Sequence, residues 1–169
     1  LVAGLRALQD DLAENGARDA DYSVPYSTVH VGRLSGGDAL NIVPDRATLL
    51  FESRHLAADP SEAIQARIDE VAQAVRGRID IEQLSAYPGL DLPAGAAVVA
   101  YAQRMAQTDL TKVAFGTEAG FFDALGVPTV VCGPGCMAGQ GHQPDEYIDR
   151  AQLDACDAMM DRILQDISQ

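Results

Sequence analysis

The sequence predicts a mixed α/β protein built from two parts that differ in how helices and strands alternate. In the first part the order is helix, strand, strand, helix, strand, which suits helices packed on one face of an antiparallel sheet. In the second part strands alternate with helices, which indicates parallel α/β architecture. The chain has 169 residues, of which 47% are hydrophobic, so it carries enough apolar material for ordinary cores.

The first part opens with apolar residues at helical spacing. They predict a helix over residues 1–15 that ends near Asn15-Gly16, a pair suited to a left-handed cap. Residues 27–34 and 47–54 then alternate between apolar and polar, as half-buried strands do. We expect these two strands to form a hairpin with a wide connection.

A second helix and a third strand follow in the first part. Asp59 precedes Pro60, and a capping side chain followed by proline at the first helical position is a typical helix start. This helix should end near Gly77, after which residues 79–84 alternate as a strand. The order resembles a ferredoxin-like βαββαβ sandwich without its first strand, and we assign it residues 1–91.

The second part, residues 92–169, follows a Pro-rich and Gly-rich boundary. In chain order we expect helix 94–107, strand 112–115, helix 118–125, strand 127–132 and helix 149–167. Two strands alone make a poor sheet. We therefore expect this part to add to a larger sheet.

Composition excludes several classes of partner. The formal net charge of -13 repels phosphates, so nucleic acid is not expected as a partner. No apolar stretch is long enough to span a bilayer. Cys132, Cys136 and Cys156 are odd in number and lack zinc-ribbon spacing, so we expect small buried apolar residues and a reducing, cytoplasmic location.

The first segment that suggests binding lies around the hairpin. Asn41 follows a pair of glycines and offers both a donor and an acceptor. Arg54 ends the following strand, and its guanidinium fork suits a carboxylate. A plain hairpin with a satisfied turn asparagine and a surface arginine would show the same pattern.

The second segment lies where a predicted strand ends and a helix starts, at Thr117 and Glu118. A hydroxyl and a carboxylate at this place can bind a ligand. The alternative is that Thr117 caps the helix and Glu118 complements its dipole, which together stabilise by about 1 to 2 kcal/mol. The residues alone leave both interpretations open.

The third segment is the glycine-rich loop 133–147, which carries Gly135 and His142. It leaves the carboxyl end of a predicted strand, where open α/β sheets bind their ligands. An imidazole among glycines and carboxylates can reach a metal, although surface histidines are also common. His142 is therefore a candidate metal ligand.

The order and spacing of these segments resemble the M20 family of zinc-dependent aminoacylases and deacylases. The motifs that carry the likeness are Thr28-Val29-His30-Val31-Gly32, Gly36-Gly37-Asp38-Ala39-Leu40-Asn41-Ile42-Val43-Pro44, Arg54, Gly116-Thr117-Glu118-Ala119-Gly120, Cys132-Gly133-Pro134-Gly135 and His142-Gln143-Pro144-Asp145-Glu146-Tyr147. The likeness covers essentially the whole chain. It implies that residues 1–91 are a lid domain that makes a homodimer, and that residues 92–169 are the carboxy-terminal part of an α/β zinc-hydrolase catalytic domain.

The resemblance also implies a reaction, the hydrolysis of the amide bond of a small N-acyl amino acid. Two zinc ions, or cobalt in their place, would activate a bridging water, and a glutamate would take its proton. Only the last metal ligand of the family matches a position here, which is His142. The other ligands and the catalytic residues would precede Leu1, so this chain alone is expected to be inactive.

For substrate binding, the resemblance implies that Asn41 and Arg54 belong to lid elements that close over the substrate. Thr117, Glu118 and Gly135 would line the pocket, and Glu118 would suit a cationic amino-acid side chain. The acyl group stays open between deacetylation, desuccinylation and related reactions. An alternative of another class is a non-catalytic module for dimerisation or interaction, in which the loop around His142 binds nothing.

Overall fold

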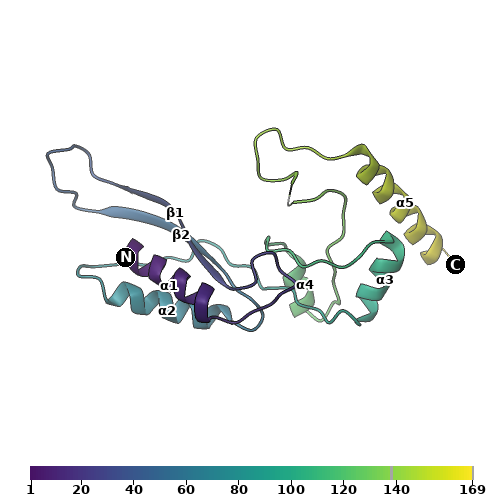
Figure 1. The fold of residues 1–169 in the computed structure, drawn as a ribbon, viewed down its shortest axis with the longest axis horizontal. Coiled ribbons are helices and arrows are strands. Elements are labelled where there is room, and N and C mark those ends of the chain that lie inside the picture. The colour runs from purple at the N-terminus through teal and green to yellow at the C-terminus, as the bar shows by residue number, and fades with distance from the viewer. Residues whose placement is uncertain (138, 169) are drawn as a thin grey trace. The chain divides into compact units, whose positions relative to one another are not determined.

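The computed structural model describes residues 1–137 and 139–168. Its elements are α1 (Val2–Asn15), β1 (Thr28–Gly36), β2 (Ala47–Arg54), α2 (Ser61–Gln73), α3 (Ala97–Ala106), α4 (Ala119–Ala124) and α5 (Arg150–Ile167) (Figure 1). The predicted mixed α/β class is therefore confirmed. None of the described helices is both long and apolar enough to cross a lipid bilayer.

The described residues form two compact units. The first comprises Leu1–Gly89 together with Lys112–Gly116, and the second comprises Leu90–Thr111 together with the described residues from Thr117 onward. The short segment at Lys112–Gly116 therefore packs with the first unit although it follows α3 in the sequence. The expected division between residues 1–91 and 92–169 stays a prediction.

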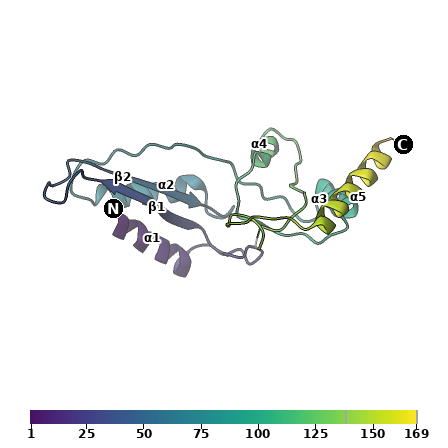
Figure 2. The ribbon, with the colours of Figure 1, turned by 90° about the horizontal axis from the view of Figure 1, so that it is seen from above.

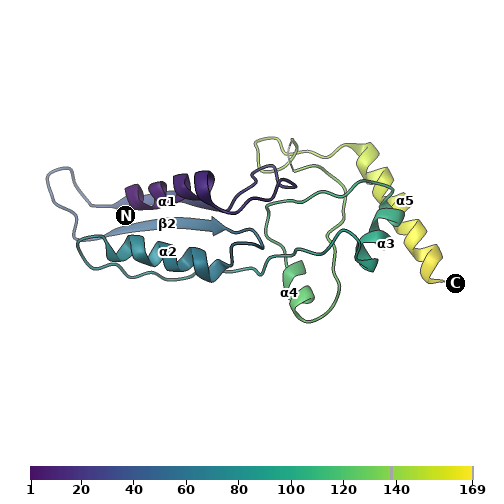
Figure 3. The same cartoon turned by 60° about the horizontal axis from the view of Figure 1, so that its bottom comes forward.

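The first unit is built on an antiparallel hairpin of β1 and β2. Its register runs from the pair of Thr28 and Arg54 at the open end to the pair of Gly36 and Ala47 at the turn. Helix α1 packs against β1, and α2 packs against α1. Both helices run along the same face of the hairpin, as Figures 2 and 3 show.

The core of the first unit lies between the two helices and β1. Its buried members are all apolar: Leu5, Leu8, Leu12, Val29, Ile64 and Ile68. Removing such a side chain from water contributes about 1.5 to 3 kcal/mol to the stability of the folded state. The leucine face of α1 is therefore the main reason why this helix packs on the hairpin. The helix and the hairpin that the sequence predicted in this region are both confirmed.

Three predicted strands do not form. Residues 79–84, 112–115 and 127–132 are irregular, and the only sheet among the described residues is the hairpin. An isolated strand leaves a row of backbone N–H and C=O groups without partners, so an alternating pattern becomes a strand only beside another strand. The described residues place no such partner next to these segments.

Helix ends also differ from the expectations in detail. α2 ends at Gln73 rather than near Gly77. The carboxylate of Asp59 accepts a hydrogen bond from the hydroxyl of Ser27 at 2.7 Å instead of capping α2. Gly16 has φ -70° and is extended, so the predicted left-handed cap of α1 is wrong.

In the second unit α3 packs against α5. Nε of Arg162 donates a hydrogen bond to the carbonyl oxygen of Met105 at 2.6 Å, which ties the end of α3 to the middle of α5. The three cysteines are free thiols, and the expectation that they are buried is wrong for Cys132 and Cys136, which are exposed, while Cys156 is half-buried. The segment that carries the first two has no sheet to bury it, which explains their exposure.

Candidate functional site

The two predicted binding residues of the first unit lie at opposite ends of the hairpin. Asn41 is exposed in the turn that joins β1 to β2, where Gly37 adopts φ +84°. Arg54 is the last residue of β2 and pairs with Thr28 at the open end. The structure therefore does not bring these two side chains together within one copy of the hairpin.

The guanidinium of Arg54 is held by two protein groups. Its Nε donates to Oε1 of Glu52 at 2.9 Å, and its Nη1 donates to the carbonyl oxygen of Ala114 at 2.9 Å. The side chain is 50% exposed, so the ion pair itself contributes little to stability. Within the described chain the other N–H groups of Arg54 make no hydrogen bond, so they stay available as donors.

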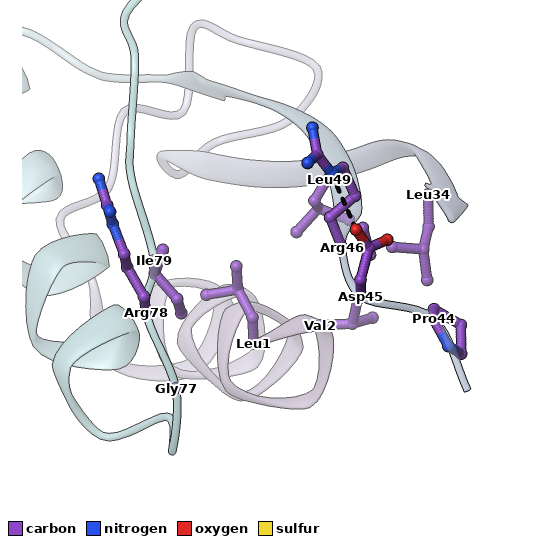
Figure 4. A pocket seen from close by; sticks show the side chains of 11 residues that line it. Leu1, Val2, Leu34, Pro44, Asp45, Arg46, Leu49, Gly77, Arg78 and Ile79 are labelled. Atoms are coloured by element: carbon purple, nitrogen blue, oxygen red, sulfur yellow. Dashed lines mark ion pairs between the residues drawn. The ribbon is translucent and has the colours of Figure 1, made fainter. Parts of the chain in front are cut away.

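A groove of about 540 Å³ opens beside β2 in the first unit. Ala47 and Leu49 of β2 line one side, residues 77–79 line the other, and Leu1 and Val2 lie between them (Figure 4). The residues that line it include none of the predicted site residues. It is therefore a separate feature, formed where the edge of the hairpin faces the segment after α2.

The predicted pair Thr117 and Glu118 stands at the start of α4. Oγ1 of Thr117 accepts a hydrogen bond from the backbone N–H of Ala119 at 3.1 Å, which is a local turn bond just before α4, whose N-cap is Glu118. Glu118 is the residue before the helix and is exposed. The hydroxyl is thus used locally, whereas the carboxylate faces solvent and can meet a charged group.

Gly135 and His142 lie in one loop of the second unit. Gly135 has φ +103°, a conformation that only glycine adopts readily. His142 is exposed and has φ +55°, which places its backbone in the left-handed region. Residues other than glycine are uncommon in this region, although histidine enters it more readily than most of them.

Gln140 links a neighbouring part of this loop to the start of α5. Its side chain is 7% exposed, its Oε1 accepts from the backbone N–H of Cys136 at 2.7 Å, and its Nε2 donates to Oδ2 of Asp149 at 3.1 Å and to Oε1 of Gln152 at 2.8 Å. Asp149 and Gln152 also form the capping box at the start of α5. Sequence reasoning missed Gln140, because a polar residue in a glycine-rich loop gives no signal of burial; the Asp149-x-x-Gln152 spacing was the available clue.

The described residues do not assemble a metal centre by themselves. No three side chains of His, Cys, Asp or Glu among residues 1–137 and 139–168 are placed to hold one ion together. Zinc sites use three or four protein ligands, and His142 offers one imidazole. The roles suggested for Asn41, Arg54 and the other sequence-derived site residues stay predictions.

Residues 1–79 match the M20 peptidase dimerisation domain. This range contains α1, the hairpin and α2, so it covers the helices and strands of the first unit. The helices and the hairpin of the first unit are therefore similar to this dimerisation domain.

Three curated relatives carry a specific name, acetylornithine deacetylase. The protein from Pasteurella multocida is 30% identical over 95% of this chain and 42% of its own length. Those from Yersinia pestis and Pectobacterium carotovorum are 32% and 34% identical over 90% and 88% of this chain, which correspond to 40% and 39% of their own lengths. Together with the dimerisation domain match, these relatives confirm the resemblance to the M20 family. The chain spans about two fifths of the length of the curated relatives that it matches.

Proposed function

We propose that the chain is part of a metal-dependent amidohydrolase that removes the acyl group of an N-acyl amino acid. Its substrate is N-acetylornithine, its place is arginine biosynthesis in the cytoplasm, and its metal is zinc or cobalt. The observation that carries the proposal is the identity of 30% to 34% with acetylornithine deacetylases over about nine tenths of the chain. The dimerisation domain over residues 1–79 supports the same family.

The residues of this chain would contribute binding groups. The unused N–H groups of Arg54 suit the α-carboxylate of the substrate, and the exposed carboxylate of Glu118 suits its side-chain ammonium. His142 offers an exposed imidazole to a metal. Because the described residues supply too few ligands for a zinc centre, the 169-residue chain by itself should show no turnover.

The substrate is tested with the intact encoded protein on N-acetylornithine, N-acetylcitrulline and N-succinyl-diaminopimelate. The highest kcat/KM should belong to N-acetylornithine. Glu118→Gln should reduce the preference for acetylornithine over acetylcitrulline, which lacks the ammonium, by about tenfold, the loss of one charge-assisted contact. Asp154→Asn, at an exposed position of α5, is the matched control and should leave the ratio unchanged. An unchanged ratio in Glu118→Gln overturns the assigned role of Glu118, and fastest turnover of the succinyl substrate overturns the assigned acyl group.

A second candidate function is a non-catalytic module that forms a homodimer through the lid. The dimerisation domain match favours it, and each strand of the two-stranded hairpin leaves one edge unpaired among the described residues. A second copy can pair along such an edge. Light scattering of the intact encoded protein should give the mass of a dimer in either case. A dimer that turns over none of the three substrates supports the module and contradicts the enzyme.

A further inference from the structure

We propose that Gln140 is a positioning residue that fixes residues 133–137 and 139–142 of the glycine-rich loop to the start of α5 and thereby sets the place of His142. Its carboxamide is the only described side chain that joins the backbone of this loop to the capping box of the helix. The functional consequence rests on the proposed role of His142 as a metal ligand. The positioning itself rests on the contacts of Gln140.

The pattern of hydrogen bonds requires an amide. Oε1 of Gln140 accepts from a backbone N–H, while the two hydrogens of Nε2 go to a carboxylate oxygen of Asp149 and an amide oxygen of Gln152. A glutamate would bring a second carboxylate against Asp149, and a methionine would donate nothing. A group that is 7% exposed cannot recover these bonds from water, so losing them opens the contact.

The other hydrogen bonds of the described loop are local: the backbone N–H groups of Gly139 and Gln140 donate to the carbonyl oxygen of Cys136, and Nε2 of Gln143 donates to that of Gly139. Glycines at positions 133, 135, 139 and 141 leave the backbone with wide conformational freedom. Between Gln140 and His142 the chain is packed closely, since a Cβ at Gly141 would lie 2.6 Å from Sδ of Met137. His142 then takes its left-handed backbone directly after this contact. We therefore expect a displacement of Gln140 to reach His142, which follows two positions later in the chain.

The test measures hydrogen–deuterium exchange of loop 133–142 in the intact encoded protein, with the wild type beside Gln140→Ala, Gln140→Met and Gln140→Glu. We expect about tenfold faster exchange in all three, because local opening no longer has to break the amide contacts. Gln140→Glu should resemble the alanine variant, since it keeps the acceptor and loses both donors. Gln165→Ala is the matched control, because Gln165 is the same residue type at an exposed position of α5, away from the loop in the sequence.

A second readout is the NMR signal of the His142 imidazole ring, assigned by comparison with His142→Ala. It should shift or broaden in the Gln140 variants and stay in place in Gln165→Ala. Gln152→Ala removes one partner from the helix side and should give a smaller change, so the inference stays testable if a Gln140 variant does not fold.

The positioning role is overturned if every Gln140 variant that folds shows exchange within twofold of the wild type and an unmoved His142 signal. Neither readout depends on turnover. If the wild type hydrolyses no acyl amino acid while both readouts change as expected, the proposed function fails and the positioning role stands.

Discussion

Asn41 and Arg54 lie at opposite ends of the β1–β2 hairpin, since Arg54 pairs with Thr28 and Asn41 follows the last strand pair at the turn. β2 alone spans about 23 Å from Ala47 to Arg54 at the rise of an extended strand, and Asn41 lies in the turn at the Ala47 end. An N-acetyl amino acid is about as long as two extended residues, or about 7 Å. One copy of the hairpin therefore cannot present both side chains to one substrate.

The first prediction is that, if both residues contact the substrate, they come from two copies of the chain. Asn41→Ala and Arg54→Ala should each lack activity, and a mixed preparation of the intact encoded proteins should regain about one quarter of it. Half of randomly paired dimers are mixed, and each mixed dimer holds one intact site of two. Steady-state turnover after co-expression measures this. Activity no greater than that of the separate variants would contradict shared sites.

The second prediction concerns Ser27, which is 1% exposed. Its Oγ donates to Oδ2 of Asp59 at 2.7 Å and accepts from the backbone N–H of Leu56 at 3.0 Å. Ser27→Ala leaves that buried N–H without a partner and should lower the free energy of unfolding by about 1 to 3 kcal/mol. Urea titration measures the loss. Ser35→Ala, on an exposed position of β1, should change it by less than about 0.5 kcal/mol, and equal effects would refute the explanation.

The third prediction concerns acid stability at Asp19. The hydrogen bond from Nζ of Lys112 at 2.8 Å, followed by that from the backbone of Asp21, holds the pKa of this carboxyl below its usual value of 3.8. A carboxyl group whose pKa is depressed in the folded state stabilises that state at pH values above 3.8. This contribution to the free energy of unfolding is lost as the pH falls through the lower pKa of the folded state. Asp19→Asn should therefore be less stable than the wild type near neutral pH.

That difference should shrink as the pH falls below the usual carboxyl range, because the wild-type group then becomes protonated as well. Urea unfolding of both proteins across the acid range measures it. Asp21→Asn is a matched control, since its carboxylate is exposed and only its backbone takes part. A difference that stays constant with pH would show that the ion pair is not its source.

The fourth prediction concerns the contact of α1 with α2. A Cβ at Gly4 would lie 2.5 Å from Cγ1 of Val71, and valine in a helix has little freedom to rotate away. Alanine gains about 1 kcal/mol over glycine in a helix, but overpacking costs about 1 to 3 kcal/mol. Gly4→Ala should therefore lower the free energy of unfolding by up to about 2 kcal/mol.

The same substitution in a Val71→Ala background should instead stabilise, because the overlapping atom is gone and the helix preference of alanine remains. Chemical unfolding of the four proteins in this cycle measures the coupling. Equal effects of Gly4→Ala in both backgrounds would contradict close packing at this point.

The helices and the hairpin could be predicted from sequence because their signals are local. The leucine spacing of α1 and the alternation of β1 and β2 each depend on neighbours within a short stretch of chain, and the structure has all three. The alternation at 79–84 is as regular, yet no strand forms there. Periodicity shows that a segment can be a strand, whereas forming one also requires a partner.

The candidate site was predictable only in part, for a related reason. The residue types at Arg54 and Glu118 follow from motifs, and motifs are visible in a single sequence. The burial of Gln140 follows from its contacts with Cys136, Asp149 and Gln152, which its own residue type does not announce. The left-handed backbone of His142 likewise has no signal in the sequence. The polar contacts of Ser27 with Asp59 and Leu56 also escaped sequence reasoning, because its partners lie about thirty positions along the chain.

Metal content and turnover of His142→Ala, measured side by side in the intact encoded protein, test the central claim most directly. The wild type should contain zinc or cobalt and release acetate from N-acetylornithine, and His142→Ala should lose bound metal and at least about a thousandfold of kcat/KM, or about 4 kcal/mol of transition-state stabilisation. His30→Ala, at an exposed position of β1, should retain both. A His142→Ala protein with full metal content and undiminished turnover would contradict the account.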